Sequence, residues 1–445
     1  MAQFFKATRT NKQNNNVIRN CLIEKLDHQG RGMLFHQKKP LFVEGGLVDE
    51  VVDLTIVEDK KRYKKGRILK THKKSELRIE PDCPHYQECG GCHLQHVEQT
   101  TQIAIKQEGL VNLFERFAKY TPEELQPALI SDAWHYRRCA RFGVMLNKKT
   151  KKVEMGFRRA ASKELINQQV CPVLVPALEE LIIPLKALLN GLQGKASLGH
   201  VELVEAEKNA AVLLRHLKPL SDQDIQLIIE FSQKHQVQFY VQSSPTDIRC
   251  LTTEPKLTYS LPEHNCEFEF NIDDFLQVNE KVNKKMVEQA ISWLELQATD
   301  SVLDLFCGLG NFTLPMAKVA KQVVGVEGIQ KMVDKGTKNA LLSGLANTQF
   351  FQADLSDLNA LKADWAKQDY NKVLLDPARA GASECMSFVA SKKPTHIVYV
   401  SCDPVTLARD SELLLTQGYW LNKVGLIDMF PQTAHMESMA LFIKK

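Results

Sequence analysis

The sequence predicts an α/β protein, with a doubly wound parallel sheet at the carboxyl end and a small β-barrel at the amino end. From about residue 267 onward, short β-branched runs alternate with helical spacing, which is the pattern of a parallel sheet covered by helices on both faces. Between Val17 and His72, short alternating runs are separated by glycine turns, which is typical of a barrel of the OB kind. The region between these two parts mixes helices and strands.

Size and composition are those of a globular protein. The 445 residues are enough for two to four domains, each with its own core. No apolar run is long enough to span a membrane, and the first residues lack the apolar segment of a secretory signal. Eleven cysteines, an odd number, suit a reducing compartment in which they bind metals or act in catalysis. We therefore expect a cytoplasmic protein without membrane contact; no obligate protein partner is evident, and a monomer is expected.

The predicted barrel ends in a strongly basic stretch. Nine of the fifteen residues from Lys60 to Lys74 are Lys or Arg, although the net charge of the whole chain is only +4. Such a run is often no more than a solvated face, but on a barrel of this kind it favours binding of RNA or DNA through the phosphate backbone. The candidate strands of the barrel are Val17–Glu24, Met33–Phe35, Leu41–Val43, Val48–Val57 and Arg67–Thr71.

Three closely spaced cysteines predict a metal site. Cys83, Cys89 and Cys92 are separated by five and two residues, and Cys171, which is also followed by a loop, is the best candidate for a fourth ligand. Four thiolates suit either zinc or an iron–sulfur cluster. Spacing alone does not separate the two, and in a zinc site His85 or His93 could replace one cysteine.

Residues 101–118 have the spacing of an amphipathic helix. After it, aromatic residues and arginines alternate from Trp134 to Gly143, and Gly156 to Arg159 follow a turn rich in lysine. Two basic, aromatic strands joined by such a turn support nucleic-acid binding, since arginine pairs with phosphate and stacks on bases. Residues 175–265 show helices and strands but no candidate chemistry.

A glycine turn and two carboxylates predict a nucleoside site in the parallel sheet. Gly308 and Gly310 follow the first strand, but Thr313 stands where a dinucleotide fingerprint has its third glycine. Glu327 ends the second strand, where a carboxylate can accept both ribose hydroxyls, and Asp354 follows the third. A nucleoside cofactor without a phosphate at the turn fits best, and S-adenosylmethionine is the common one. Phe275, Gln277 and Asn279, just before a helix, are a candidate clamp on cofactor and base.

Cys402 is the candidate nucleophile. It follows an apolar β-branched run and precedes helical spacing from Val405, so it lies at the carboxyl end of a strand in an open α/β sheet. Most buried cysteines are only structural. The amino end of a helix, however, favours the thiolate, which is the nucleophilic form.

Taken together, these motifs resemble those of RNA uracil-C5 methyltransferases. Phe275-Leu-Gln277-Val-Asn279 is similar to the family's F-x-Q-V-N motif, and Ser401-Cys402-Asp403-Pro404 is similar to its nucleophile motif, usually written S-C-N-P. Asp403 in place of Asn is a departure that we expect to raise the pKa of the thiol slightly. The segment Phe430–Glu437 resembles the one that carries the family's general base.

The resemblance implies a domain order and a set of site residues. Residues 12–71 would form a TRAM barrel, residues 75–265 a central domain with a [4Fe–4S] cluster, and residues 266–445 a class I S-adenosylmethionine-dependent methyltransferase domain. Cys402 and Glu437 would be catalytic. The implied cofactor-binding residues are Gln277, Phe306, Asn311, Glu327, Asp354 and Asp376, and the implied cluster ligands are Cys83, Cys89, Cys92 and Cys171.

The same resemblance implies a substrate and a mechanism. The barrel and the cysteine cluster occur together in the branch that acts on 23S ribosomal RNA, whereas the tRNA branch lacks both and another rRNA branch lacks the barrel. The Cys402 thiolate would add to C6 of a flipped uridine, and C5 would then take the methyl group. Glu437, on a largely apolar strand that raises its pKa towards neutrality, would remove the C5 proton.

Other interpretations are weaker. The same chemistry could act on another uridine of rRNA or tRNA, or the chain could be a non-catalytic RNA-binding factor in ribosome assembly. An iron–sulfur oxidoreductase would need a dinucleotide fingerprint, which is absent from the sequence. In DNA cytosine-C5 methyltransferases the nucleophile normally follows proline, whereas Cys402 follows Ser401.

Overall fold

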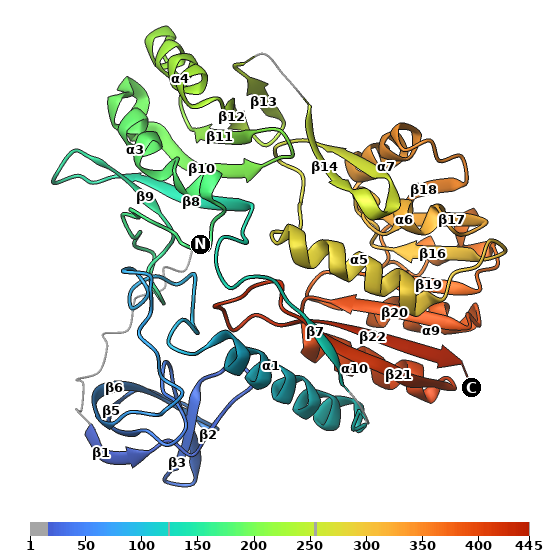
Figure 1. Cartoon of the computed structure of the whole chain (residues 1–445), viewed down its shortest axis with the longest axis horizontal. Coiled ribbons are helices and arrows are strands. Elements are labelled where there is room, and N and C mark those ends of the chain that lie inside the picture. Colours follow the sequence, from blue (N-terminus) through green and yellow to red (C-terminus); the bar gives the residue numbers. More distant parts are fainter. Residues whose placement is uncertain (1–16, 123–124, 253–255, 445) are drawn as a thin grey trace, which may run out of the picture.

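The computed structural model describes residues 17–122, 125–252 and 256–444. The chain forms three parts, each built on its own sheet, and Figure 1 shows them around a common centre. Of the predicted barrel range 12–71, residues 12–16 lie outside the described residues. None of the described helices is both long and apolar enough to cross a membrane.

Six strands of the described residues form the first sheet, in the order β1-β5-β6-β4-β3-β2. All five predicted strands are present, together with the two-residue strand β2. Glu50 is fully buried beside this sheet and accepts hydrogen bonds from Arg78 Nε (2.6 Å) and Nη2 (2.8 Å), which fixes the sheet to the segment that follows it. The strands are β1 (Val17–Leu22), β2 (Lys25–Leu26), β3 (Gly32–His36), β4 (Lys39–Val43), β5 (Val51–Asp59) and β6 (Lys64–Lys73).

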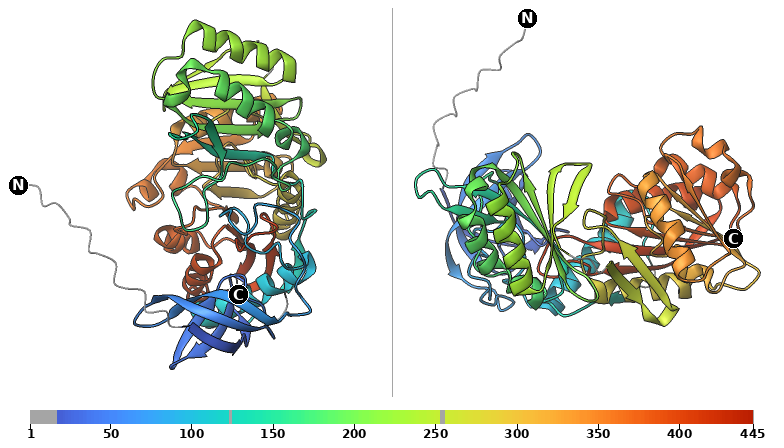
Figure 2. Two further views of the ribbon diagram at one scale, coloured as in Figure 1. Left: turned by 90° about the vertical axis from the view of Figure 1, so that its left-hand side faces the viewer. Right: turned by 90° about the horizontal axis from the view of Figure 1, so that it is seen from above.

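The central part has a second sheet, with the order β13-β12-β11-β10-β8-β9 in the described residues. Helices α3 and α4 lie beside each other against it (Figure 2). Helix α4 begins where Ser221 and Asp224 form a capping box, so the sequence signal and the observed helix start coincide. The elements are β8 (Cys139–Leu146), β9 (Val153–Gly156), α2 (Pro176–Glu179), α3 (Ile182–Gly191), η2 (Gln193–Ser197), β10 (Leu198–Glu205), β11 (Ala210–His216), α4 (Asp222–His235), β12 (Gln238–Ser244) and β13 (Asp247–Cys250).

The third sheet has the order β18-β17-β16-β19-β20-β22-β21-β7 in the described part of the chain. The first five strands are parallel, β22 is antiparallel to β20, and β7 adds an edge from a distant part of the sequence. The strands are β16 (Ser301–Leu305), β17 (Gln322–Glu327), β18 (Thr348–Gln352), β19 (Lys372–Leu375), β20 (His396–Ser401), β21 (Tyr419–Ile427), β22 (Glu437–Lys444) and β7 (Leu125–Leu129).

Helices cover both faces of this third sheet because its strands are apolar on both sides. Val398 of β20 belongs to the core under α5, α6 and α7, whereas its neighbour Tyr399 belongs to the core under α9, α10 and α1. The helices are α1 (Gln99–Leu113), continued by η1 (Phe114–Ala118), and α5 (Glu280–Leu294), α6 (Thr313–Ala317), α7 (Gln330–Leu342), α8 (Asp364–Lys367), α9 (Ser383–Ser391) and α10 (Pro404–Thr416), with short 3-10 turns η3 (Pro262–His264) and η4 (Ala360–Lys362).

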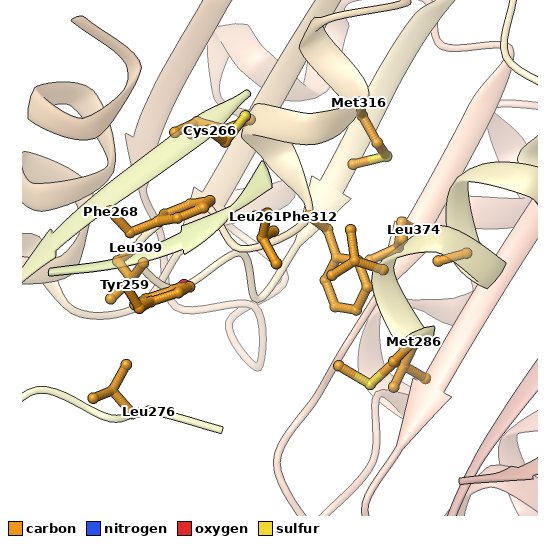
Figure 3. Packing of buried hydrophobic residues seen from close by; sticks show 14 of the residues in the cluster. Tyr259, Leu261, Cys266, Phe268, Leu276, Met286, Leu309, Phe312, Met316 and Leu374 are labelled. Carbon is orange, nitrogen blue, oxygen red and sulfur yellow. The ribbon is translucent and has the colours of Figure 1, made fainter. Parts of the chain in front are cut away.

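A small two-stranded sheet, β14 (Leu257–Leu261) and β15 (Cys266–Phe270), closes the first of these cores. Tyr259 and Phe268 stack with ring centroids 4.6 Å apart, and Met286 of α5, Phe312 and Leu374 of β19 belong to the same core (Figure 3). Leu309, which lies in the glycine turn after β16, belongs to the same core, so this packing holds the turn in place.

Candidate active site

The predicted cofactor and catalytic residues gather at one edge of the third sheet. Leu305, Val326, Leu375 and Tyr399 are neighbours across the parallel strands, so the residues that follow them emerge together. Carboxyl ends of parallel strands are where such sheets bind ligands. Phe306, Glu327, Asp354, Asp376 and Cys402 all end a strand here or follow one closely.

Cys402 lies between the end of β20 and the start of α10. Asp403 caps that helix by accepting a hydrogen bond from Val405 N (3.0 Å), and Pro404 occupies the first turn. Ser401 Oγ donates to the Asp403 carbonyl (2.9 Å) and accepts from Asp403 N (3.1 Å), which tightens the turn. The Cys402 Sγ lies 4.0 Å from the Pro377 carbonyl oxygen. The thiol is therefore held by two structured turns.

Glu437 begins β22, at the same edge. Ser401 pairs with Ser438 at the end of the antiparallel ladder, and Ile427 of β21 pairs with Glu437. Cys402 and Glu437 are the neighbours of that last Ser401–Ser438 pair, so both lie at the same end of the ladder. Glu437 is only 7% exposed. Burial, and then the nearby charge of Asp376, raises the pKa of Glu437 to about 8, while Arg379 opposes the rise.

The pKa of Cys402 is raised as well, to about 11. Burial is the main cause, the carboxylates of Glu437 and Asp376 add to it, and Arg379 acts in the opposite direction. This differs from the expectation that the helix start would favour the thiolate. The Asp403 carboxylate accepts a hydrogen bond from Val405 N at the helix cap, and its expected effect on the pKa of the thiol stays a prediction.

Two further carboxyls lie beside the pair. Burial raises the pKa of Asp376 to about 7. Asp304, inside β16, is fully buried; burial first and then the charges of Asp376 and Glu327 raise its pKa to about 8, although Thr313 donates a hydrogen bond to it at 2.5 Å. Several carboxyls in one small, poorly hydrated region are a common feature of active sites.

Both glycines of the turn after β16 have left-handed backbone conformations. Gly308 and Gly310 have φ of 56° and 99°, and a Cβ on Gly310 would lie 2.5 Å from Leu314 Cδ1. Phe306 also has positive φ, at 64°. Glu327 accepts hydrogen bonds from Gly308 N (3.1 Å) and Ile329 N (3.0 Å), so its carboxylate is fixed at the turn with lone pairs left for a ligand.

The other predicted cofactor residues differ in their surroundings. Asp354 is exposed and accepts two hydrogen bonds from Ser356. Asn311 exchanges hydrogen bonds with Asn283 (2.9 and 3.2 Å) and accepts one from Tyr259 (3.1 Å). Its side chain is thus held by the protein before any ligand is considered.

The three residues of the predicted clamp differ: Asn279 and Gln277 form hydrogen bonds within the protein, whereas Phe275 is exposed. Asn279 is fully buried and caps α5 by accepting a hydrogen bond from Val282 N (3.2 Å). Gln277 is half-buried, and its backbone carbonyl accepts a hydrogen bond from Arg138 Nε (2.9 Å). Phe275 is 73% exposed, which leaves its ring free for an aromatic ligand.

The four predicted metal ligands line one cavity of about 320 Å³. Cys83, Cys89 and Cys171 are buried and Cys92 is half-buried, whereas neither His85 nor His93 lines the cavity. Within the described residues, no group of three or more His, Cys, Asp or Glu side chains is arranged around a single metal ion. Arg379, Phe430 and His435 line the same cavity, so it lies close to the catalytic edge of the sheet.

The basic segment from Trp134 is less available than predicted. Arg138 is 3% exposed, donates to the Gln277 carbonyl and lies 4.9 Å from the Tyr259 ring centroid, so it joins two parts of the protein. Arg141 and Arg159 form ion pairs with glutamates. In the basic stretch of the first sheet, Lys64 is buried, while most of its neighbours are exposed.

With this geometry, the chain matches known proteins. The family model described as tRNA (Uracil-5-)-methyltransferase matches residues 98–445. The 23S rRNA (uracil(1939)-C(5))-methyltransferase RlmD of Psychromonas ingrahamii is 60% identical, and the match covers 99% of this chain and 100% of that protein. The chain belongs to the uracil-5-methyltransferase family. The protein of the same description from Photobacterium profundum is 46% identical, with 100% of this chain and 97% of its own length covered.

A solved structure shares the fold. The structure of Pyrococcus abyssi tRNA (uracil-54, C5)-methyltransferase in complex with S-adenosyl-L-homocysteine superposes with a TM-score of 0.73 at 21% identity, covering 95% of this chain and 100% of that one. The third sheet therefore has the class I S-adenosylmethionine-dependent methyltransferase fold, as predicted.

Some site residues of this family member were not predicted from the sequence. Arg379 was not among the predicted site residues, yet its charge acts on both Cys402 and Glu437. Asn283 and Tyr259 hold Asn311 from 28 and 52 residues away, and no local pattern marks them. For Arg379 the available signal was a cation two residues beyond the Asp376-Pro377 turn.

Proposed function

We propose that this enzyme transfers a methyl group from S-adenosylmethionine to C5 of a uridine in 23S ribosomal RNA, the uridine equivalent to the uracil 1939 named for its relatives. The support is identity of 43–60% with proteins of that description over nearly the whole chain. Because ribosomal RNA is the proposed substrate, we place the reaction in the cytoplasm, where ribosomes are assembled.

The observation that carries the proposed mechanism is that Cys402 and Glu437 lie at the same end of the β20–β22 ladder, beside its last pair Ser401–Ser438, and that the Glu437 charge acts on the thiol. C5 of uracil is a poor nucleophile. When the Cys402 thiolate bonds to C6, the ring becomes an enolate, and C5 then attacks the methyl group of the donor, which leaves as a neutral thioether. Glu437 takes the C5 proton, the ring double bond re-forms, and the C6–S bond breaks to return the thiolate.

The electrostatics of the free protein fit an enzyme that is activated by its substrates. A thiol with a pKa of about 11 is protonated at neutral pH. The donor's sulfonium carries a positive charge, which would lower the pKa of a thiol close to it. Glu437, with a pKa of about 8, is poised near working pH, as a general base should be.

We assign the donor to the glycine turn. Glu327, whose carboxylate is fixed by Gly308 N, would accept the ribose hydroxyls, and Asp354 would receive the adenine amino group. Phe306 and Asn311 line the turn, and Asp376 would lie between donor and base. Gln277 would contact the donor or the flipped uracil from the opposite side.

We assign a [4Fe–4S] cluster to Cys83, Cys89, Cys92 and Cys171. The supporting observation is that all four thiols line one cavity of about 320 Å³. Four thiolates around one cavity suit a cubane, in which each thiolate bonds a different iron. The bound cluster would cross-link the loop of residues 83–92 to Cys171.

We further propose that the three parts are a TRAM barrel (residues 12–71), a central iron–sulfur domain (residues 75–265) and the methyltransferase domain (residues 266–445). The exposed basic residues of the first sheet would bind the RNA phosphate backbone. Arg62, Arg67, Lys70 and Lys73 are exposed candidates.

Methyl transfer from labelled S-adenosylmethionine to 23S rRNA that lacks the modification tests this proposal. The expected product is 5-methyluridine at one mapped position, and transfer RNA should serve as the negative control. Labelling of transfer RNA instead, or of no RNA, would overturn the assignment.

A further inference from the structure

The connection between β21 and β22, residues 428–436, leads directly into Glu437. It leaves the sheet and extends towards the centre of the molecule, between its three parts (Figure 1). Gln432 lies in the middle of this connection, is 4% exposed and has φ of 67°, which few residues other than glycine adopt without support. Such a conformation persists only where the surroundings impose it.

Helix α1 supplies part of that support. Gln102, fully buried, donates from Nε2 to the Gln432 side-chain oxygen (2.9 Å) and accepts from Gln432 N through its own oxygen (3.0 Å). One turn further, Lys106 Nζ lies 2.7 Å from Asp428 Oδ1 and 3.3 Å from the Phe430 carbonyl oxygen. One face of α1 therefore holds both the first residue and the centre of the connection.

The segment that follows Cys92 supplies the rest. The Gln432 carbonyl accepts hydrogen bonds from His93 N (2.9 Å) and Leu94 N (3.0 Å), the two residues next to that cysteine. Gln102 Nε2 also lies within hydrogen-bond distance of the carbonyl oxygens of Leu94 (3.0 Å) and Val97 (2.8 Å), so its two N–H groups are shared among three acceptors. The Gln102 amide thus joins α1 to the segment just before it and to the connection 330 residues away. The hydrogen bonds of the Gln102 side chain are buried, where an unsatisfied partner is costly.

A second contact reaches the same connection from the cysteine cavity. Tyr136, which lines that cavity, donates a hydrogen bond to the Pro431 carbonyl (3.0 Å). On the far side of Gln432, Thr433 accepts a hydrogen bond from His435 N (3.2 Å), so the turn is continuous to within two residues of Glu437.

We propose that Gln102 and Gln432 are positioning residues for the general base. They fix the 428–436 connection to α1 and to the segment beside Cys92, so that Glu437 is aligned when the four-cysteine site is formed. This inference rests on the proposed function. It assigns to the cysteine site a mechanical role at the proton-removal step, in addition to any role in folding or RNA binding.

The proposal separates two stages of the reaction. Addition of Cys402 and methyl transfer do not use Glu437, whereas removal of the C5 proton and release of the RNA do. Loss of the Gln102 amide should therefore leave adduct formation within about twofold and slow release by about tenfold or more, since small misplacements of a catalytic group have effects of this size.

The test compares Gln102→Met with Gln107→Met. Gln107 lies on the same helix, is half-buried, and is not among the residues that the structure bonds to the connection. Both variants are studied as full-length, iron-loaded proteins. Adduct formation is measured with RNA that carries 5-fluorouridine at the target. Release is measured with normal RNA, as the fraction of the protein that is found in a denaturant-stable adduct. Amide hydrogen exchange at His93 and Leu94, and the iron content, are measured without substrate.

We expect Gln102→Met, but not Gln107→Met, to accumulate adduct on normal RNA. In Gln102→Met the amide hydrogens of His93 and Leu94 should also exchange faster, while the iron content is unchanged. Equal behaviour of the two variants, or equal slowing of formation and release, would overturn the inference. Gln432→Gly tolerates the positive φ and keeps the backbone carbonyl of residue 432, but it loses the side-chain amide. This variant should give the same result as Gln102→Met, and it provides the test if Gln102→Met does not fold. If the unmodified protein forms no adduct with 5-fluorouridine RNA, the proposed function itself fails.

Discussion

Cys402 and Glu437 lie next to the last pair of the antiparallel ladder between β20 and β22. That pair joins Ser401 to Ser438, so Cys402 follows the end of β20 where Glu437 begins β22. Burial raises the pKa of both groups, and the Glu437 carboxylate adds to the rise in the pKa of the thiol. In the proposed mechanism, the residue that forms the bond to uracil and the residue that allows its release therefore lie at the same end of one strand pair.

Glu437→Gln should stop the reaction after methyl transfer. Glutamine keeps the shape of the side chain but does not accept the C5 proton, so the methylated RNA stays bonded to Cys402. We expect a protein–RNA species that survives denaturant and contains one transferred methyl group, with turnover reduced by a factor of about 10² or more. Recovery of free protein and fully released product would point to another base.

The release step should become faster as the pH rises towards 8. The pKa of Glu437 is about 8, so below that value most of the carboxyl is protonated and is not a base. In single-turnover experiments, the rate of adduct breakdown should rise about ninefold from pH 6 to pH 7 and about fivefold from pH 7 to pH 8, while the adduct remains intact in Glu437→Gln across that range. A rate of breakdown that does not change over this range would contradict the assignment.

Burial of Glu437 should also affect stability. A carboxyl whose pKa is raised from its ordinary value of 4.5 to about 8 on folding stabilises the folded chain in its protonated form. This contribution is complete below the unfolded pKa and is lost as the pH rises through the folded one. Glu437→Gln, which removes the buried acid, should therefore unfold a few degrees higher than the parent at pH 8.5 and nearly equal to it at pH 4.5. Thermal unfolding at the two pH values measures the difference, and a gain that is larger at pH 4.5 would be inconsistent with this account.

Glu327 and Asp354 should differ in their importance for the methyl donor. Glu327 is held by two backbone N–H groups beside the glycine turn, whereas Asp354 is exposed and bonded to Ser356. We expect Glu327→Gln to weaken binding of S-adenosylmethionine by about tenfold or more, since a fixed carboxylate that accepts two hydroxyls is lost. Asp354→Asn should weaken it by less than about threefold. Calorimetric titration of both variants checks the order, and the reverse order would exclude the proposed pose.

The sequence predicted the parts of the fold that depend on local pattern. Helix α4 (Asp222–His235) lies in the region where the sequence predicted helices and strands, and Ser221 and Asp224 mark its start. The prediction that Cys402 lies at the carboxyl end of a strand was correct, because the switch from apolar β-branched residues to a proline turn is a strong local signal. Glu437 lies on the apolar strand on which it was predicted.

What the sequence did not predict depends on contacts between distant residues. The bond between Gln102 and Gln432 spans 330 residues, and β7 joins the third sheet from a position almost 300 residues away from its partner β21. The helix start was expected to favour the thiolate of Cys402, but its pKa is raised. Burial is the main cause, and the carboxylates of Glu437 and Asp376, which come from other strands, add to it. Arg138 was expected on a nucleic-acid surface, but folding buries it.

The covalent bond between Cys402 and C6 of the uracil is the central claim, and RNA that carries 5-fluorouridine at the target tests it most directly. Fluorine at C5 does not leave as a proton, so after methyl transfer the enzyme should remain bonded to the RNA. We predict a denaturant-stable species in which mass spectrometry places the nucleotide on the peptide containing Cys402, and no such species with Cys402→Ala. Absence of the adduct with the unmodified protein, or its formation by Cys402→Ala, would contradict the mechanism.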